Sequence, residues 1–217
     1  MQNHASTLAA EFKLDAARVA ATVALIDEGN TIPFIARYRK EATGSMDDQT
    51  LRALDERLSY LRKLDDQKET VHNSITEQGA MTPEIAAALE KAKTLAEVED
   101  IYRPYKPKRK TRASIARARG LEPLAARLLE QRPEDEPALL ARQYITEEVP
   151  DTEAALAGAR DILAEGFSDS ANLRATLRSL YNATALVESK AAKKDTDSVY
   201  SGYYDYSEPA AKMAGHR

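Results

Sequence analysis

The feature that most constrains the fold is a long apolar repeat in the first half of the chain. Its members recur at spacings of three and four: Leu51, Leu54, Leu58, Leu61, Leu64, Val71 and Ile75. This spacing places apolar side chains along one face of a helix. We therefore predict a single spine helix from about Asp47 to about Gln78, about 45 Å long. A stripe of this length needs several packing partners.

The composition favours an all-α protein. The chain has 217 residues, of which 43% are hydrophobic, with only 8 glycines and 9 prolines, and no segment alternates strictly between apolar and polar residues. We expect an all-α, multi-helix assembly around the spine helix, with Thr184–Glu188 as a short strand or an extended segment.

Capping and turn residues predict shorter helices on both sides of the spine. These are a helix that begins at Asp15 and ends at Gly29, one from Pro33 to Tyr38, others capped by Thr82, Thr94 and Ser114, and two at Thr152–Glu165 and Asp169–Tyr181. We expect a helical region over residues 1–190 and the start of a following segment at 191–217. Short helices at about 80–150 allow a helix-turn-helix-like subdomain, although their spacing fits other helical bundles as well.

Several classes of protein are excluded or disfavoured. The chain has no cysteine, which excludes a disulfide scaffold, a thiolate metal site and a cysteine nucleophile. It has no signal-peptide pattern and no apolar run that approaches a membrane span. We therefore expect a cytoplasmic protein without a membrane partner.

Two basic stretches depart from the acidic average of the chain, which has a formal net charge of −4. They are Ile32–Gly44 and Ile101–Pro123, and the second has no acidic residue between Arg103 and Arg119. Like charges repel one another, so a local cluster of them suggests that a polyanion binds there.

The second stretch is the stronger candidate for nucleic-acid binding. Pro104 and Pro107 exclude regular helix and stiffen the loop, which lowers the entropy lost on binding. Two tyrosines can stack on unpaired bases. The candidate residues are Lys106, Lys108, Arg109, Lys110, Arg112 and Arg117 for phosphate, and Tyr102 and Tyr105 for stacking. Two alternatives remain, namely pairing with neighbouring acids such as Glu97, Glu99 and Asp100, or a protein-binding surface.

The first stretch is the weaker candidate. Arg37, Arg39 and Lys40 follow a short apolar helix and can bind phosphate. Cations at the end of a helix also complement its dipole, so a structural role is at least as good an interpretation. We expect Pro33, Phe34 and Ile35 to pack in the core.

No catalytic pattern is present in the sequence. The three histidines, His4, His72 and His216, have no acidic partner at metal-ligand spacing. No glycine-rich phosphate loop, nucleophile elbow or metal-binding loop occurs. We therefore expect no enzymatic activity, no metal and no cofactor.

Several long motifs resemble one known family. They are IPFIARYRKEATGSMDD at Ile32–Asp48, ERLSYLRKL at Glu56–Leu64, SITEQG at Ser74–Gly79, DIYRPYKPKRKTRASIARARGLEPLA at Asp100–Ala125, GARDILAE at Gly158–Glu165 and YYDYSEP at Tyr203–Pro209. Together these motifs, which extend over essentially the whole chain, resemble the Tex family of bacterial transcription accessory proteins.

The resemblance implies a function and an organisation. In the family, a helical N-terminal part with a helix-turn-helix-like subdomain precedes a ribonuclease-H-like domain, helix-hairpin-helix modules and a C-terminal RNA-binding domain, to which nucleic-acid binding is mainly attributed. Since the match stops at residues 215–217, the resemblance implies a truncated piece. We expect an N-terminal scaffold of a protein that binds nucleic acid non-specifically, RNA more than DNA. The alternative is a module that docks the transcription machinery or downstream domains. The sequence leaves the oligomeric state open.

Overall fold

The computed structural model describes residues 4–107, 110–192 and 198–214. The chain divides into two compact units, Met1–Val98 and Glu99–Arg217, called the N-terminal and C-terminal units below. The helices up to the boundary are α1 (Ala5–Phe12), α2 (Ala16–Asp27), α3 (Ile32–Tyr38), α4 (Lys40–Thr43), α5 (Asp48–Glu77), α6 (Pro83–Lys91) and α7 (Leu95–Tyr102), the last of which crosses it.

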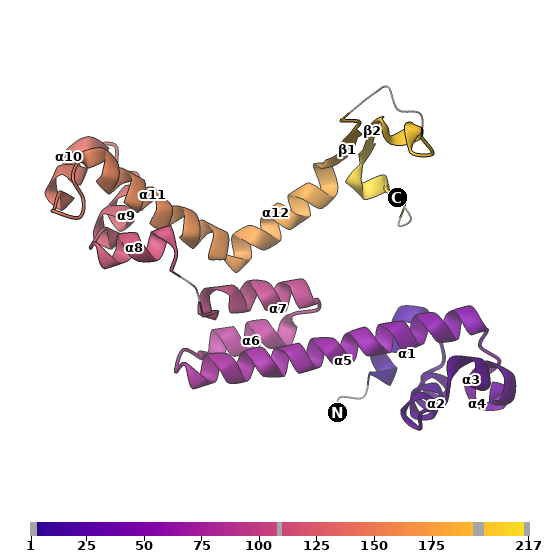
Figure 1. Ribbon diagram of the computed structural model, residues 1–217. Coiled ribbons are helices and arrows are strands. Elements are labelled where there is room, and N and C mark those ends of the chain that lie inside the picture. Colours follow the sequence, from indigo (N-terminus) through magenta and orange to yellow (C-terminus); the bar gives the residue numbers. More distant parts are fainter. Residues whose placement is uncertain (1–3, 108–109, 193–197, 215–217) are drawn as a thin grey trace. The chain divides into compact units, whose positions relative to one another are not determined.

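The C-terminal unit continues with helices and ends in a small sheet (Figure 1). Its elements are the 3-10 turn η1 (Arg103–Tyr105), α8 (Arg112–Ala118), α9 (Glu122–Leu129), α10 (Pro137–Ala141), η2 (Arg142–Tyr144), α11 (Thr152–Asp169), α12 (Ala171–Thr184), β1 (Leu186–Lys190), η3 (Ser201–Tyr203), β2 (Asp205–Pro209) and η4 (Ala210–Lys212). No helix within the described ranges is both long and apolar enough to cross a membrane.

The predicted spine helix is confirmed as α5. It begins where the Asp47 side chain accepts a hydrogen bond from the Thr50 amide at 2.7 Å, which satisfies one of the free amides of the first turn. All seven residues of the apolar repeat are buried in it.

Short helices cover the apolar face of α5 in the N-terminal unit. Figure 1 shows α2, α3 and α4 gathered near the N-terminal end of α5, with α6 beside its C-terminal half. One core cluster joins α1, α2 and α5, and contains Leu8, Val19, Leu54 and Leu58 with at most 1% of each exposed. Helix α1 therefore belongs to the core of this unit.

The C-terminal unit has its own core, built around α11. Helices α8, α9 and α10 pack against α11, and the buried cluster contains Leu121, Leu124 and Val149. Gly158 allows this close packing, because a Cβ at that position would lie 2.4 Å from Cδ1 of Leu121. The two units thus bury separate cores.

The chain after α12 forms an antiparallel hairpin. Strand β1 pairs with β2, with Leu186 opposite Pro209 and Lys190 opposite Asp205. The all-α prediction is thus confirmed for the bulk of the chain, with a small two-stranded sheet added. The strand begins two residues later than the segment Thr184–Glu188 suggested. The helix-turn-helix-like subdomain at about 80–150 and the domain limits stay predictions.

A buried carboxylate fixes α12 within the C-terminal unit. Asp100 is 3% exposed and accepts hydrogen bonds from Nε of Arg174 and Nη2 of Arg178, one turn apart on α12. Burial alone would raise the pKa of Asp100, but the hydrogen bonds and positive charges of both arginines outweigh it and hold that pKa below its ordinary value. Asp100 is therefore ionised in the folded protein at neutral pH.

Candidate nucleic-acid interface

Several cations of the second basic stretch have acidic partners. Lys106 forms an ion pair with Glu99, and its ammonium lies 5.6 Å from the ring centroid of Tyr102. Arg117 hydrogen-bonds Glu165 on α11, and this contact raises the pKa of the arginine. For Lys106, the structure therefore shows the alternative of pairing with a neighbouring acid.

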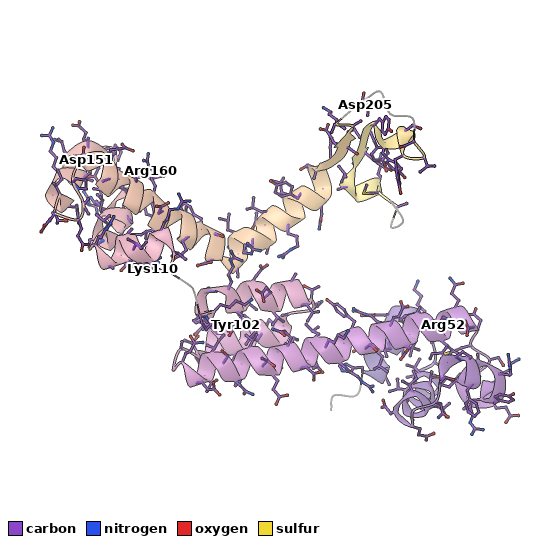
Figure 2. All side chains as sticks on the ribbon, viewed as in Figure 1. Arg52, Tyr102, Lys110, Asp151, Arg160 and Asp205 are labelled. Atoms are coloured by element: carbon purple, nitrogen blue, oxygen red, sulfur yellow. The ribbon has the colours of Figure 1, made fainter. Side chains whose placement is uncertain are left out.

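The remaining residues of this stretch are more open. Arg112 is largely exposed and lies 3.8 Å from Asp161. Lys110 precedes α8 (Figure 2) and is exposed, with no ion pair to any of the described residues. Lys108 and Arg109 lie outside the described residues. Tyr102 and Tyr105 are half-buried, and Tyr102 is covered by Lys106, so they are poorer stacking surfaces than expected.

An open cleft of about 580 Å³ lies beside this stretch. Its lining includes Arg117 together with the carboxylates of Glu165 and Asp169. Asp169 is also bound by Arg103, with 3.1 Å between Nε and Oδ1. Because carboxylates line the cleft, its charge does not favour a phosphate backbone.

The first basic stretch forms a more open cationic surface. Arg37 lies on α3, Arg39 lies between α3 and α4, and Lys40 begins α4. All three are exposed, and none of them forms an ion pair within the described ranges. We call these residues the α3–α4 surface. The acid next to them in sequence, Glu41, is exposed as well.

Buried residues on the other side hold these short helices in place. Ile35 on α3 and Thr43 on α4 are each 0% exposed, and α3 packs against α5 while α4 packs against α2. Helix α4 ends at Gly44 with φ of 69°, in the left-handed region that favours glycine. The packing of α3 and α4 thus fixes the backbone that carries these three cations.

Sequence reasoning missed a fourth cation near this surface. Arg18 on α2 is exposed, and a Cβ at Gly44 would lie 2.4 Å from its Cδ and Nη1 atoms. The guanidinium therefore lies against the end of α4, although 26 positions separate it from Gly44 in the sequence. The close contact at Gly44 and the packing of α4 on α2 reveal this neighbour.

The same surface exposes two aromatic rings. Phe34 and Tyr38 are 37% and 62% exposed, and their ring centroids lie 5.2 Å apart. The Cζ atom of Arg39 lies 5.4 Å from the centroid of the Phe34 ring. The expectation that Pro33 and Phe34 pack in the core is therefore wrong, because only Ile35 of that trio is buried.

No group of three or more metal-ligating side chains occurs among the described residues. His4 has an acidic neighbour that local spacing does not reveal, since its Nε2 lies 3.2 Å from Oδ2 of Asp65. This contact joins the start of α1 to α5.

Comparisons with known proteins identify two matching regions. Residues 2–76 match the Tex-like protein N-terminal domain, and residues 132–217 match a region described as Tex central region-like. "Protein tex" of Bordetella pertussis is 48% identical over 214 residues, which are 97% of this chain and 27% of that protein. "Transcriptional accessory protein Tex" of Neisseria gonorrhoeae is 45% identical over 212 residues, 97% of this chain and 28% of that protein.

A more distant relative is human. "S1 RNA-binding domain-containing protein 1" of Homo sapiens is 37% identical over 110 residues, half of this chain and 11% of that protein. The chain thus spans under a third of the length of each of these three relatives.

Proposed function

Because this chain belongs to the Tex family, we propose that it is the N-terminal helical scaffold of a cytoplasmic transcription accessory protein that binds nucleic acid without sequence specificity. The name of the Neisseria relative supports the transcription role. The name of the human relative supports RNA over DNA as the nucleic acid. In this proposal the chain performs no catalytic step and needs no cofactor.

The observation that carries the proposal is the exposure of the cations on the α3–α4 surface. Arg37, Arg39 and Lys40 are solvated and have no acidic partner among the described residues. Cations in this state can exchange their counterions for phosphates, which is the main source of non-specific affinity for nucleic acid. Lys110 and Arg112 add a second, smaller contact surface in the C-terminal unit. Lys106 and Arg117 contribute less, since binding phosphate would disrupt their ion pairs.

A second function has an observation of its own. Helix α12 exposes Leu173, Leu177 and Leu180, at spacings of four and three, with 38% to 54% of each accessible. An apolar stripe of this kind on a solvent-facing helix fits a protein partner. In this alternative the chain docks the transcription machinery or further domains and has no contact with nucleic acid.

Salt dependence of RNA binding tests the proposal. Substituting Arg37, Arg39 and Lys40 together by Ala should weaken binding of single-stranded RNA. It should also make the slope of log K against log [salt] shallower by about 2, because each phosphate contact on a single strand contributes about 0.7. Fluorescence anisotropy with a labelled RNA of mixed sequence, over a series of salt concentrations, measures both quantities.

A matched control removes the same charge elsewhere in the N-terminal unit. Lys63, Lys91 and Lys93 are exposed and form no ion pair in the described part of the chain. Their triple Ala variant should bind RNA with nearly the wild-type slope. The proposal fails if the wild-type chain does not bind at low salt, or if the two triple variants behave alike. Absence of RNA binding would favour the protein-docking alternative.

A further inference from the structure

We propose that Phe34, Tyr38 and Arg39 form a stacking platform that makes the α3–α4 surface a site for single-stranded nucleic acid. The inference rests on the proposed function and extends it, since it specifies the strandedness of the ligand and adds an aromatic platform that contacts a base. Phe34 and Tyr38 carry no positive charge, so their role can be separated from that of the cations.

The geometry of α3 presents both rings to solvent. Phe34 and Tyr38 are four residues apart, one turn of helix, so they lie on the same face. Ile35, the residue after Phe34, is 0% exposed and anchors the helix. A helix of seven residues thus exposes both of its aromatic side chains, although burial of an aromatic ring is ordinarily favourable.

The contacts between these side chains restrict where a base can stack. The two rings lie 5.2 Å apart with an interplanar angle of 45°, so they already touch and leave no room for a base between them. Arg39 lies over the Phe34 ring, at 5.4 Å from its centroid. Tyr38 has the larger exposed fraction, 62%. We therefore expect the exposed face of the Tyr38 ring to receive the base.

The charges around the rings identify the occupant as a polyanion. Arg37 and Lys40 are exposed beside the aromatic pair, and Arg18 lies at the end of α4. Cations that track a phosphate backbone, together with aromatic rings that stack on its bases, are the combination by which proteins bind single strands. A duplex offers phosphates to the same cations, but its bases are already stacked on one another.

The Tyr38→Ala variant tests the platform. Stacking of one base on an aromatic side chain contributes about tenfold in affinity. We expect Tyr38→Ala to weaken binding of single-stranded RNA by about tenfold, with an unchanged salt slope because no charge is lost. Affinity for duplex RNA and for an abasic strand of the same length should not change. Tyr38→Phe keeps the ring and should bind like the wild type.

A spectroscopic variant gives an independent readout. The chain has no tryptophan, so Tyr38→Trp introduces a single indole. Its fluorescence should be quenched by single-stranded RNA and much less by the abasic strand. Tyr181→Trp is the matched control, because Tyr181 is 64% exposed on α12, and its indole should not respond.

The outcomes separate this inference from the proposed function. Normal binding of single-stranded RNA by Tyr38→Ala, with no quenching in Tyr38→Trp, would overturn the platform while the salt-dependent binding stands. Equal loss of affinity for single-stranded, duplex and abasic ligands would overturn it as well, since it would show that Tyr38 does not contact bases. If the wild type bound no nucleic acid, the proposed function and the platform would both fail.

Discussion

Leu54→Ala is expected to lower the free energy of unfolding of the N-terminal unit by about 2 to 5 kcal/mol. Leu54 is 0% exposed and packs in the cluster that joins α1, α2 and α5. Truncation removes apolar contacts and leaves a cavity between helices that collapse only partly. Urea unfolding followed by circular dichroism measures the loss.

The same helix provides the control for this prediction. Lys63 is exposed on α5 and forms no ion pair among the described residues. Lys63→Ala should change the free energy of unfolding by less than about 0.5 kcal/mol. If Leu54→Ala cost no more than Lys63→Ala, the packing of short helices on the spine would be wrong.

Asp100→Ala is expected to destabilise the C-terminal unit by about 3 kcal/mol. The substitution leaves Arg174 and Arg178 without the buried carboxylate that both hydrogen-bond. Each arginine side chain is about a third exposed, so water can hydrate the unpaired guanidinium groups and offset part of the lost stability. Thermal unfolding of the variant, compared with that of the wild type, measures the effect.

Asp161→Ala is the control for this prediction, because the contact of Asp161 with Arg112 is long and largely exposed. This substitution should lower the free energy of unfolding by less than about 1 kcal/mol.

The contribution of Asp100 should also depend on pH in a defined direction. Its pKa is lower in the folded protein than in the unfolded chain, so its stabilising effect is complete above the unfolded value of about 4. The effect is lost as the pH falls through the lower folded value. The difference in stability between wild type and Asp100→Asn should therefore be constant near neutral pH and shrink in acid. A difference that grew on acidification would contradict the ion pairs.

Local sequence patterns predict the longer helices well. The repeat from Leu51 to Ile75 specifies α5, because the spacing of its seven apolar members matches one face of a helix. The predicted caps Asp15 and Thr82 are confirmed at the starts of α2 and α6. Helix α1 was missed, because no capping side chain marks its start at His4. The sequence places the start of α8 too late, because it names Ser114 as the cap of this helix. In the structure Thr111 is the cap, and Ser114 completes its capping box.

The candidate site shows what local patterns leave out. The sequence offers nearby acids such as Glu99, which is the partner of Lys106. It does not reveal the partner of Arg117, because Glu165 is 48 positions away and meets it only when α8 packs on α11. The lack of acidic residues between Arg103 and Arg119 therefore does not show that these cations lack partners, since acids distant in sequence can reach them. The exposure of Phe34 was missed for a related reason, since an apolar residue in a short helix is ordinarily assumed to be buried.

Amide chemical-shift mapping tests the central claim most directly. The isotope-labelled chain is titrated with single-stranded RNA at low salt, and the shift of each amide signal is followed. If the open cations of the α3–α4 surface bind the phosphates, the largest shifts should fall at residues 34–44 and at Arg18, with smaller ones near Lys110 and Arg112. Shifts confined to residues 99–119, or no shifts at any RNA concentration, would contradict the claim.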